Sequence, residues 1–219
     1  MTSQVRKPNE EKAFSIMMNA LKARYGCASI IHEQVDKPDY GMIWKNKRVG
    51  IEILGIDNSK IIQSIKSHGK KGSKAFKSYN KAISNSIPYT IYNQTTVIDE
   101  NFVSKDLSKK MELYSSYKAN FDEVFLIVHC ETLNNPIFLR KLRVIANNYL
   151  LDNNCLFRKV YLVDLNRNEL VGKIYDSKNK KRYNMTSNLA RYTSESSSNQ
   201  FFLVDEEFKL FKTYNNETK

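Results

Sequence analysis

The chain has 219 residues, and 41% of them are apolar. It is therefore long and apolar enough to bury one sizeable core, which argues against global disorder. Glycine and proline are scarce, which argues against an all-β fold with many turns. Lysine and arginine number 35 against 23 aspartate and glutamate residues, which gives a net charge of +12. A charge of this size attracts polyanions, above all nucleic acid; the simpler alternative is that it serves solubility.

The cysteines, the first residues of the chain and the length of its apolar runs indicate the cellular compartment. Cys27, Cys130 and Cys155 are odd in number and widely spaced, which fits neither a disulfide framework nor a zinc pattern. Reduced thiols are typical of the cytoplasm. The first eleven residues are polar, and no apolar run approaches the ~20 residues that a membrane helix needs. We therefore expect a cytoplasmic protein with no signal peptide and no membrane partner.

The first predicted element is a helix at residues 10–24. Apolar side chains recur there at the spacing of one helical face, and Asn9 fits the position of the N-cap. Glu10 and Glu11 fall in the first turn, where acids complement the helix dipole even without a further role. The members of the apolar face are Phe14, Met17, Met18 and Leu21.

Three predicted strands follow this helix. Residues 29–35 form the first strand, whose isoleucines are expected in the core. Residues 39–44 and 49–54 form the next two strands, joined by a polar turn at residues 45–48. Asn46 tolerates the positive φ that a tight turn requires, so this pair of strands is predicted to be a β-hairpin.

A long basic segment comes next. Residues 58–98 contain no acidic residue, and aromatic side chains are interleaved with the lysines. Such a run is often only a solvated face, but the lack of acids favours contact with phosphates. A helix is predicted within residues 73–84, after a loop at residues 69–72. The lysines are Lys60, Lys66, Lys70, Lys71, Lys74, Lys77 and Lys81.

Helices and strands alternate in the second half of the chain. Residues 107–119 predict a helix, and Lys110 points to its apolar face because it lies three residues after Leu107 and four before Tyr114. Residues 121–130 form a continuous apolar run, which predicts a strand buried on both faces. The order of elements is that of a layered α/β domain. Further elements are a helix at residues 136–151, strands at 160–163 and 170–175, a low-complexity linker at 193–199 and a docking segment at 201–211.

Two acidic residues fall on opposite arms of the predicted hairpin. With the turn centred near Asn46, opposed residue numbers sum to about 91 to 93, so Asp39 faces a position from Glu52 to Leu54. Opposed side chains have their Cβ atoms about 5 Å apart. Two carboxylates at that distance can share a hard divalent cation such as Mg²⁺ or Mn²⁺, which lowers the pKa of bound water and neutralises phosphodiester charge.

Glu52 also requires a partner for its own charge. Its neighbours Ile51 and Ile53 are apolar, and an ionised glutamate in a core strand is rare unless it is paired or bound to metal. The alternative is that Glu52 faces solvent and pairs with Lys47 or Arg48.

These residues resemble the motif of the PD-(D/E)XK, or restriction-endonuclease-like, superfamily: Pro38-Asp39 followed by Gly50-Ile51-Glu52-Ile53-Leu54-Gly55. In that family the two acids bind Mg²⁺, and a lysine two residues after the second acid positions the attacking water. An acid of the first helix often completes the site, and Glu10 or Glu11 would match it. The segment from Lys110 through Tyr117 to Ile127 is similar to the helix and buried strand that follow the motif.

One position departs from the family pattern. Leu54 stands where the family has its lysine, and leucine can neither hold water nor offset charge. The resemblance allows a lysine relocated to the following helix, for which Lys110 is the first candidate. The alternative is that Lys110 lies at the helix edge with its ammonium group in solvent.

The resemblance implies a restriction-endonuclease-like core at residues 1–180, with a central mixed β-sheet flanked by helices and a basic insertion at about residues 56–100. A basic extension at residues 181–219 would dock back on the core. The implied function is a Mg²⁺-dependent endonuclease that cleaves nucleic acid, with DNA the expected substrate, and the family allows a homodimer. Asp39 and Glu52 would bind the metal, and the lysines of residues 60–81 would contact phosphates.

Two alternatives remain open. Loss of the motif lysine favours a nucleic-acid-binding protein, or a subunit of a larger complex, that keeps the fold without catalysis. The basic face could also meet an acidic partner protein.

Overall fold

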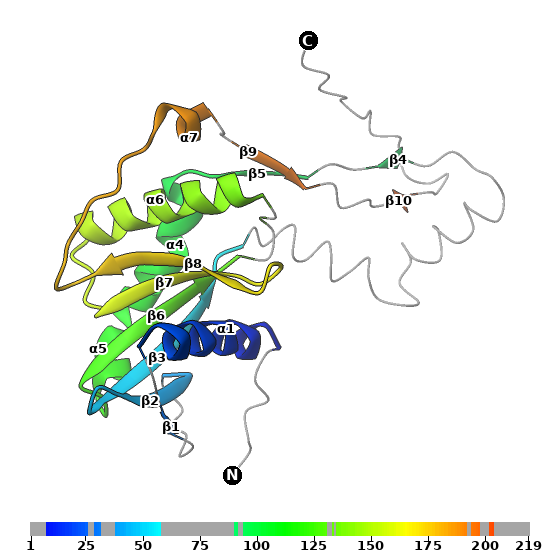
Figure 1. Ribbon diagram of the computed structural model, residues 1–219. Helices are drawn as coiled ribbons and strands as arrows, with labels where there is room; N and C mark the ends of the chain where they lie inside the picture. The colour runs from blue at the N-terminus through cyan, green and yellow to red at the C-terminus, as the bar shows by residue number, and fades with distance from the viewer. Residues whose placement is uncertain are drawn as a thin grey trace, which may run out of the picture.

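The computed structural model has a mixed β-sheet at its centre, with helices on both faces (Figure 1). The residues that it describes are 8–25, 29–31, 38–57, 90–91, 94–130, 133, 135–191, 194–197 and 202–203. The sheet consists of β1 (Ser29–Ile31), β2 (Tyr40–Trp44), β3 (Lys47–Gly55), β6 (Glu123–His129), β7 (Lys159–Asp164) and β8 (Glu169–Asp176). The predicted α/β class with a mixed sheet flanked by helices is confirmed.

The six strands are hydrogen-bonded in the order β1-β2-β3-β6-β7-β8. β3, β6 and β7 run parallel to one another, while β1, β2 and β8 join antiparallel to their neighbours. β6 lies inside the sheet, and its residues Val124 to Val128 have no exposed surface. The prediction of a strand buried on both faces is therefore confirmed.

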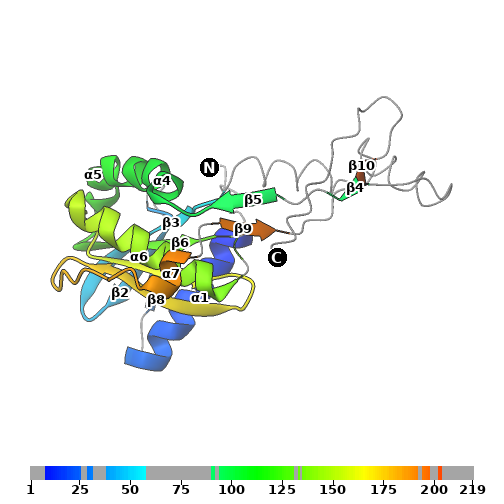
Figure 2. The ribbon, with the colours of Figure 1, turned by 90° about the horizontal axis from the view of Figure 1, so that it is seen from above.

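The helices form two layers, one on each face of the sheet (Figures 1 and 2). α1 (Pro8–Tyr25) packs on one face with the predicted stripe, since Phe14, Met17, Met18 and Leu21 are all buried. α4 (Glu100–Glu112), α5 (Tyr114–Lys118) and α6 (Pro136–Asp152) pack on the other face. The side chains of β3 alternate between the two apolar clusters, because successive residues of a strand point to opposite faces.

The hairpin of β2 and β3 turns in two residues. Lys45 and Asn46 both have positive φ, at 52° and 60°, which is the backbone of a tight hairpin turn that suits the twist of the strands. Lys47 and Arg48 already belong to β3, so the turn is shorter than the predicted residues 45–48.

Several predicted details are wrong. α1 begins at Pro8, so Asn9 lies inside the first helical turn and is not the N-cap. Ile30 is 37% exposed because β1 is the edge strand, not a core strand. The helix predicted at residues 107–119 starts earlier, where Asp99 caps it by accepting a hydrogen bond from the amide of Phe102, and it ends at a turn before α5.

The C-terminal part of the chain also contains strands. β9 (Ser194–Ser197) pairs with β5 (Gln94–Val97), so residues predicted as a low-complexity linker are partly a strand. β10 (Phe202–Leu203) pairs with β4 (Thr90–Ile91), and the short helix α7 (Ser187–Arg191) precedes β9. The helix predicted within residues 73–84 lies outside the described residues. Among the helices that the structure describes, none combines the length and apolarity needed to cross a bilayer.

Candidate active site

The register of the hairpin brings Asp39 and Glu52 together. Tyr40 pairs with Ile51, and each step along β2 pairs with one step back along β3. Asp39 directly precedes Tyr40, so it stands opposite Glu52, as the predicted register requires. Its Oδ2 accepts a hydrogen bond of 2.7 Å from the backbone amide of Ile53. This bond fixes the carboxylate at the end of the hairpin, beside Glu52.

Pro38 and Gly50 of the short motif form a packed support beneath Asp39. A Cβ atom added to Gly50 would lie 2.6 Å from Cγ of Pro38 and 3.1 Å from the ring of Phe121. Only glycine therefore lets the proline lie directly on the backbone of β3. The contact explains why these residue types occur together, since the proline sets where the next residue, Asp39, leaves the sheet.

Glu52 is a buried carboxylate on the face of the sheet that α4, α5 and α6 cover, opposite to the face that α1 covers. Only 4% of its surface is exposed, and its neighbours Ile51 and Ile53 point to the α1 side. The alternative of a solvent-facing Glu52 paired with hairpin cations is wrong. Lys47 instead pairs with Glu123 at 2.5 Å, and the Arg48 amide donates to Asp122.

Lys110 of α4 supplies the charge partner of Glu52. Its ammonium nitrogen forms an ion pair and hydrogen bond with Oε1 of Glu52, and its side chain is 23% exposed. The same nitrogen lies 5.8 Å from the centre of the Tyr117 ring. The alternative of a solvent-directed ammonium group is therefore wrong, because Lys110 reaches the carboxylate of Glu52.

Tyr117 of α5 is a further residue of the site that the sequence did not mark as functional. It is 3% exposed. Its pKa is raised by burial, by the negative charge of Glu52 and by a side-chain hydrogen bond with Glu52. The phenol therefore stays protonated and donates a hydrogen bond to the carboxylate of Glu52. The only signal in the sequence was its place between Lys110 and the buried strand.

The electrostatics of Asp39 reveal a site that is crowded with negative charge. Burial and the charge of Glu52 raise the pKa of Asp39 from 3.8 to about 6, although the Ile53 amide and Lys110 act in the opposite direction. Glu10 of α1 also raises this pKa, so its charge reaches the site from the other layer. Glu11 is exposed, and no described contact joins it to the pair.

The donor set fits a hard divalent cation in chemistry. Two carboxylates lie side by side, their charges repel, and each offers oxygen, the ligand that Mg²⁺ prefers. A bound cation would relieve the repulsion that raises the pKa of Asp39. Among the described residues, no group of three or more histidine, cysteine, aspartate or glutamate side chains is arranged to hold a metal ion. Mg²⁺ usually retains several waters and needs only one or two protein carboxylates.

The lysines predicted to contact phosphates belong to the basic segment at residues 58–98. Lys60, Lys66, Lys70, Lys71, Lys74, Lys77 and Lys81 all lie outside the described residues.

Fold and site together define a class: a mixed-sheet α/β domain with a partly buried acidic pair at a hairpin and a lysine and a tyrosine contributed by the covering helices. Comparisons with protein-family models, curated proteins and solved structures give no match for this chain. The function must therefore be inferred from the geometry of the site.

Proposed function

We propose that this chain is a Mg²⁺-dependent endonuclease of the PD-(D/E)XK kind, with DNA as its substrate. The observation that carries the proposal is the contact of Lys110 with Glu52. The motif position two residues after Glu52 is Leu54, and a lysine from α4 brings an ammonium group to the same carboxylate. In chain order, α1 precedes the three sheet strands β1, β2 and β3, and α4 and α5 directly precede the buried parallel strand β6, an arrangement that supports the same family core.

Each residue of the site has a role in this proposal. Asp39 and Glu52 would hold the cation, which when bound would neutralise charge on the phosphodiester and lower the pKa of water. Lys110 places a positive charge beside them, where it can orient the attacking water and stabilise the negative charge that develops on phosphate. Tyr117 holds Glu52 by a hydrogen bond, so that the carboxylate keeps one orientation.

The basic character of the chain supports a polyanionic substrate. The net charge of +12 attracts nucleic acid, and contacts with backbone phosphates are independent of sequence and weaken as salt rises. The lysines of residues 60–81 are proposed as such contacts, and a homodimer would let two sites cut two strands.

A nuclease assay tests the proposal. The wild-type chain is incubated with supercoiled and linear duplex DNA, single-stranded DNA and RNA, with Mg²⁺ or with EDTA. We expect Mg²⁺-dependent cleavage that falls at least a hundredfold in Glu52→Gln and Lys110→Met, because each variant removes a charged group from the reacting centre. The matched control is Lys109→Met, which removes an adjacent, exposed lysine of α4. Cleavage that survives Glu52→Gln, or that falls equally in Lys109→Met, would overturn the proposal.

A second candidate is a nucleic-acid-binding protein without catalysis. The observation that favours it is the buried ion pair itself, because Lys110 already neutralises Glu52 without a metal. In that case the same assay gives no cleavage of any substrate, while DNA binding persists with a steep dependence on salt.

A further inference from the structure

A cavity lined by arginines lies at the carboxyl end of β7. Its volume is about 320 Å³, which is at the lower end for pockets that hold a small organic ligand. It is formed by the first half of α6, the end of β7, the start of β8 and the turn between these strands, elements that contribute no residue to the acidic pair. Ligands of open α/β sheets bind at this edge, outside the carboxyl ends of the strands.

Two of the arginines come from one face of α6. Leu139, Arg140 and Arg143 follow Pro136 by three, four and seven residues, so the four lie on the same side of the helix, and all of them line the cavity. Arg140 is exposed, whereas Arg143 is half-buried. The cavity therefore has two guanidinium groups about one helical turn apart.

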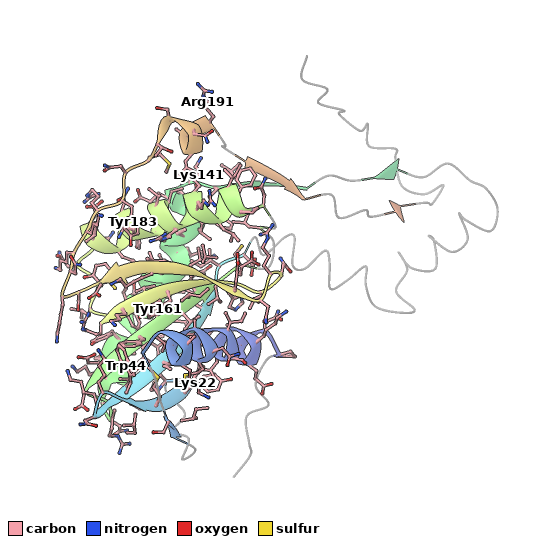
Figure 3. The ribbon with its side chains drawn as sticks, in the orientation of Figure 1. Lys22, Trp44, Lys141, Tyr161, Tyr183 and Arg191 are labelled. Carbon is pink, nitrogen blue, oxygen red and sulfur yellow. The ribbon has the colours of Figure 1, made fainter. Side chains whose placement is uncertain are left out.

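Arg143 is held in place from several sides. Its Nε donates to the carbonyl of Lys173 at 3.0 Å, and its Nη2 donates to the hydroxyl of Tyr183 at 3.1 Å. The guanidinium lies 4.6 Å from the centre of the Tyr183 ring, and Figure 3 shows Tyr183 beside α6. A guanidinium has five N–H donors, so these bonds leave donors for a ligand.

Gly172 makes room for that guanidinium. A Cβ atom at this position would stand 3.2 Å from Cζ of Arg143, and φ of Gly172 is 151°, which side-chain-bearing residues rarely adopt. The backbone of β8 is thus shaped to let Arg143 cross it. This placement fixes the arginine before any ligand binds, which lowers the entropic cost of binding.

The three arginines that line the cavity outnumber its two acids, Asp164 and Glu169. Asp164 is 1% exposed, and its Oδ1 accepts from the backbone amides of Asn166 and Arg167 at 2.8 and 3.0 Å. Its Oδ2 accepts from Nη1 of Arg167 at 2.9 Å. Asp164 therefore serves to hold the turn and Arg167, while Glu169 is an exposed acid at the rim.

We propose that this cavity binds a small organic phosphate, a phosphate monoester of about nucleotide size. Arg140, Arg143 and Arg167 would take the phosphate, because guanidinium groups match phosphate oxygens by paired hydrogen bonds. Leu139, Leu170 and Val171 line the same space and would contact the apolar part of the ligand. The ligand is either a free nucleotide or the phosphorylated end of a nucleic-acid strand, and the site does not depend on the proposed nuclease activity.

Isothermal titration calorimetry of the full chain with adenosine 5′-monophosphate tests this site. We expect binding that is at least tenfold tighter than that of inorganic phosphate or adenosine. Arg140→Gln and Arg143→Gln should each weaken it about tenfold, as for loss of a charge-assisted hydrogen bond. Arg143→Gln also removes the contact with Tyr183. Arg140 is exposed, so Arg140→Gln tests the site without disturbing that contact.

The matched control is Arg182→Gln, which removes the same charge from an exposed arginine paired with Asp152 outside the cavity. It should change the affinity less than twofold. No binding at millimolar nucleotide, equal binding of inorganic phosphate, or equal weakening by Arg140→Gln and Arg182→Gln would each overturn the proposal. A 5′-phosphorylated dinucleotide that binds tighter than the mononucleotide identifies the strand end as the source, and the reverse order identifies the free nucleotide.

Discussion

Replacing Asp39 by asparagine should stabilise the protein when no divalent cation is present, and should abolish its stabilisation by Mg²⁺. The folded protein raises the pKa of Asp39 from 3.8 to about 6, chiefly through burial and the charge of Glu52. The folded state therefore binds more protons than the unfolded state between these two values. The free energy of unfolding consequently falls as pH rises through this window and stays low above pH 6.

The size of the effect follows from the shift. Two pKa units correspond to roughly 3 kcal/mol of penalty on the ionised carboxylate, all of it present at pH 7.5. Asparagine removes the charge and keeps an oxygen for the Ile53 amide, although this neutral hydrogen bond is weaker by about 1 kcal/mol. We expect a net gain of about 1–2 kcal/mol, which for a chain of this length raises Tm by about 2–8 °C.

Thermal unfolding followed by circular dichroism at pH 7.5 measures this effect in EDTA and in 10 mM Mg²⁺. For a site that binds Mg²⁺ with a Kd near 1 mM, the wild type should gain about 1.4 kcal/mol from the cation, and Asp39→Asn should gain none.

Asp122→Asn is the matched control for this experiment. Asp122 also accepts a backbone amide through Oδ2, at 2.8 Å from Arg48, but it is exposed. Its replacement should be neutral or slightly destabilising and should leave the Mg²⁺ effect intact. Destabilisation by Asp39→Asn of the same size as in the control, with an unchanged Mg²⁺ effect, would refute the electrostatic reasoning.

Three more predictions concern packing and charge near the hairpin. Tyr117→Phe should lower the free energy of unfolding in urea by about 1–3 kcal/mol, because a buried hydrogen bond to Glu52 is lost; no change would contradict that bond. Gly50→Ala should cost about 1–3 kcal/mol and reduce cleavage, since its Cβ would collide with the proline before Asp39; wild-type stability would disprove the contact. Burial lowers the pKa of Lys159 from 10.5 to about 8. The free energy of unfolding of the wild type should therefore rise relative to that of Lys159→Met between pH 8 and 10. A difference between the two proteins that does not change with pH would argue against burial of the charge.

Much of the hairpin and of the central sheet could be predicted because the signals are local. The turn at Asn46 fixes the register, and the register alone places Asp39 opposite Glu52. The continuous apolar run of β6 similarly indicates burial on both faces. The helical spacing of Lys110 indicated the face on which it lies, although not the residue that it would contact.

Other features depend on contacts between segments far apart in the chain. Ile30 is exposed because of the position of its strand at the sheet edge, which no local pattern specifies. The helical spacing already places Tyr117 on the face of Lys110, but no local pattern shows that this face meets Glu52 of a distant strand. The arginine cavity requires α6 to meet the turn before β8, and its residues are unremarkable in sequence.

The most direct test of the central claim is the position of Mn²⁺ in crystals soaked with that ion, measured by anomalous scattering. We expect one ion within about 2.0–2.3 Å of a carboxylate oxygen of both Asp39 and Glu52, with Lys110 still close to Glu52. A map that shows no ion between the two carboxylates, whether or not that Mn²⁺ concentration supports cleavage, would contradict a metal site at Asp39 and Glu52.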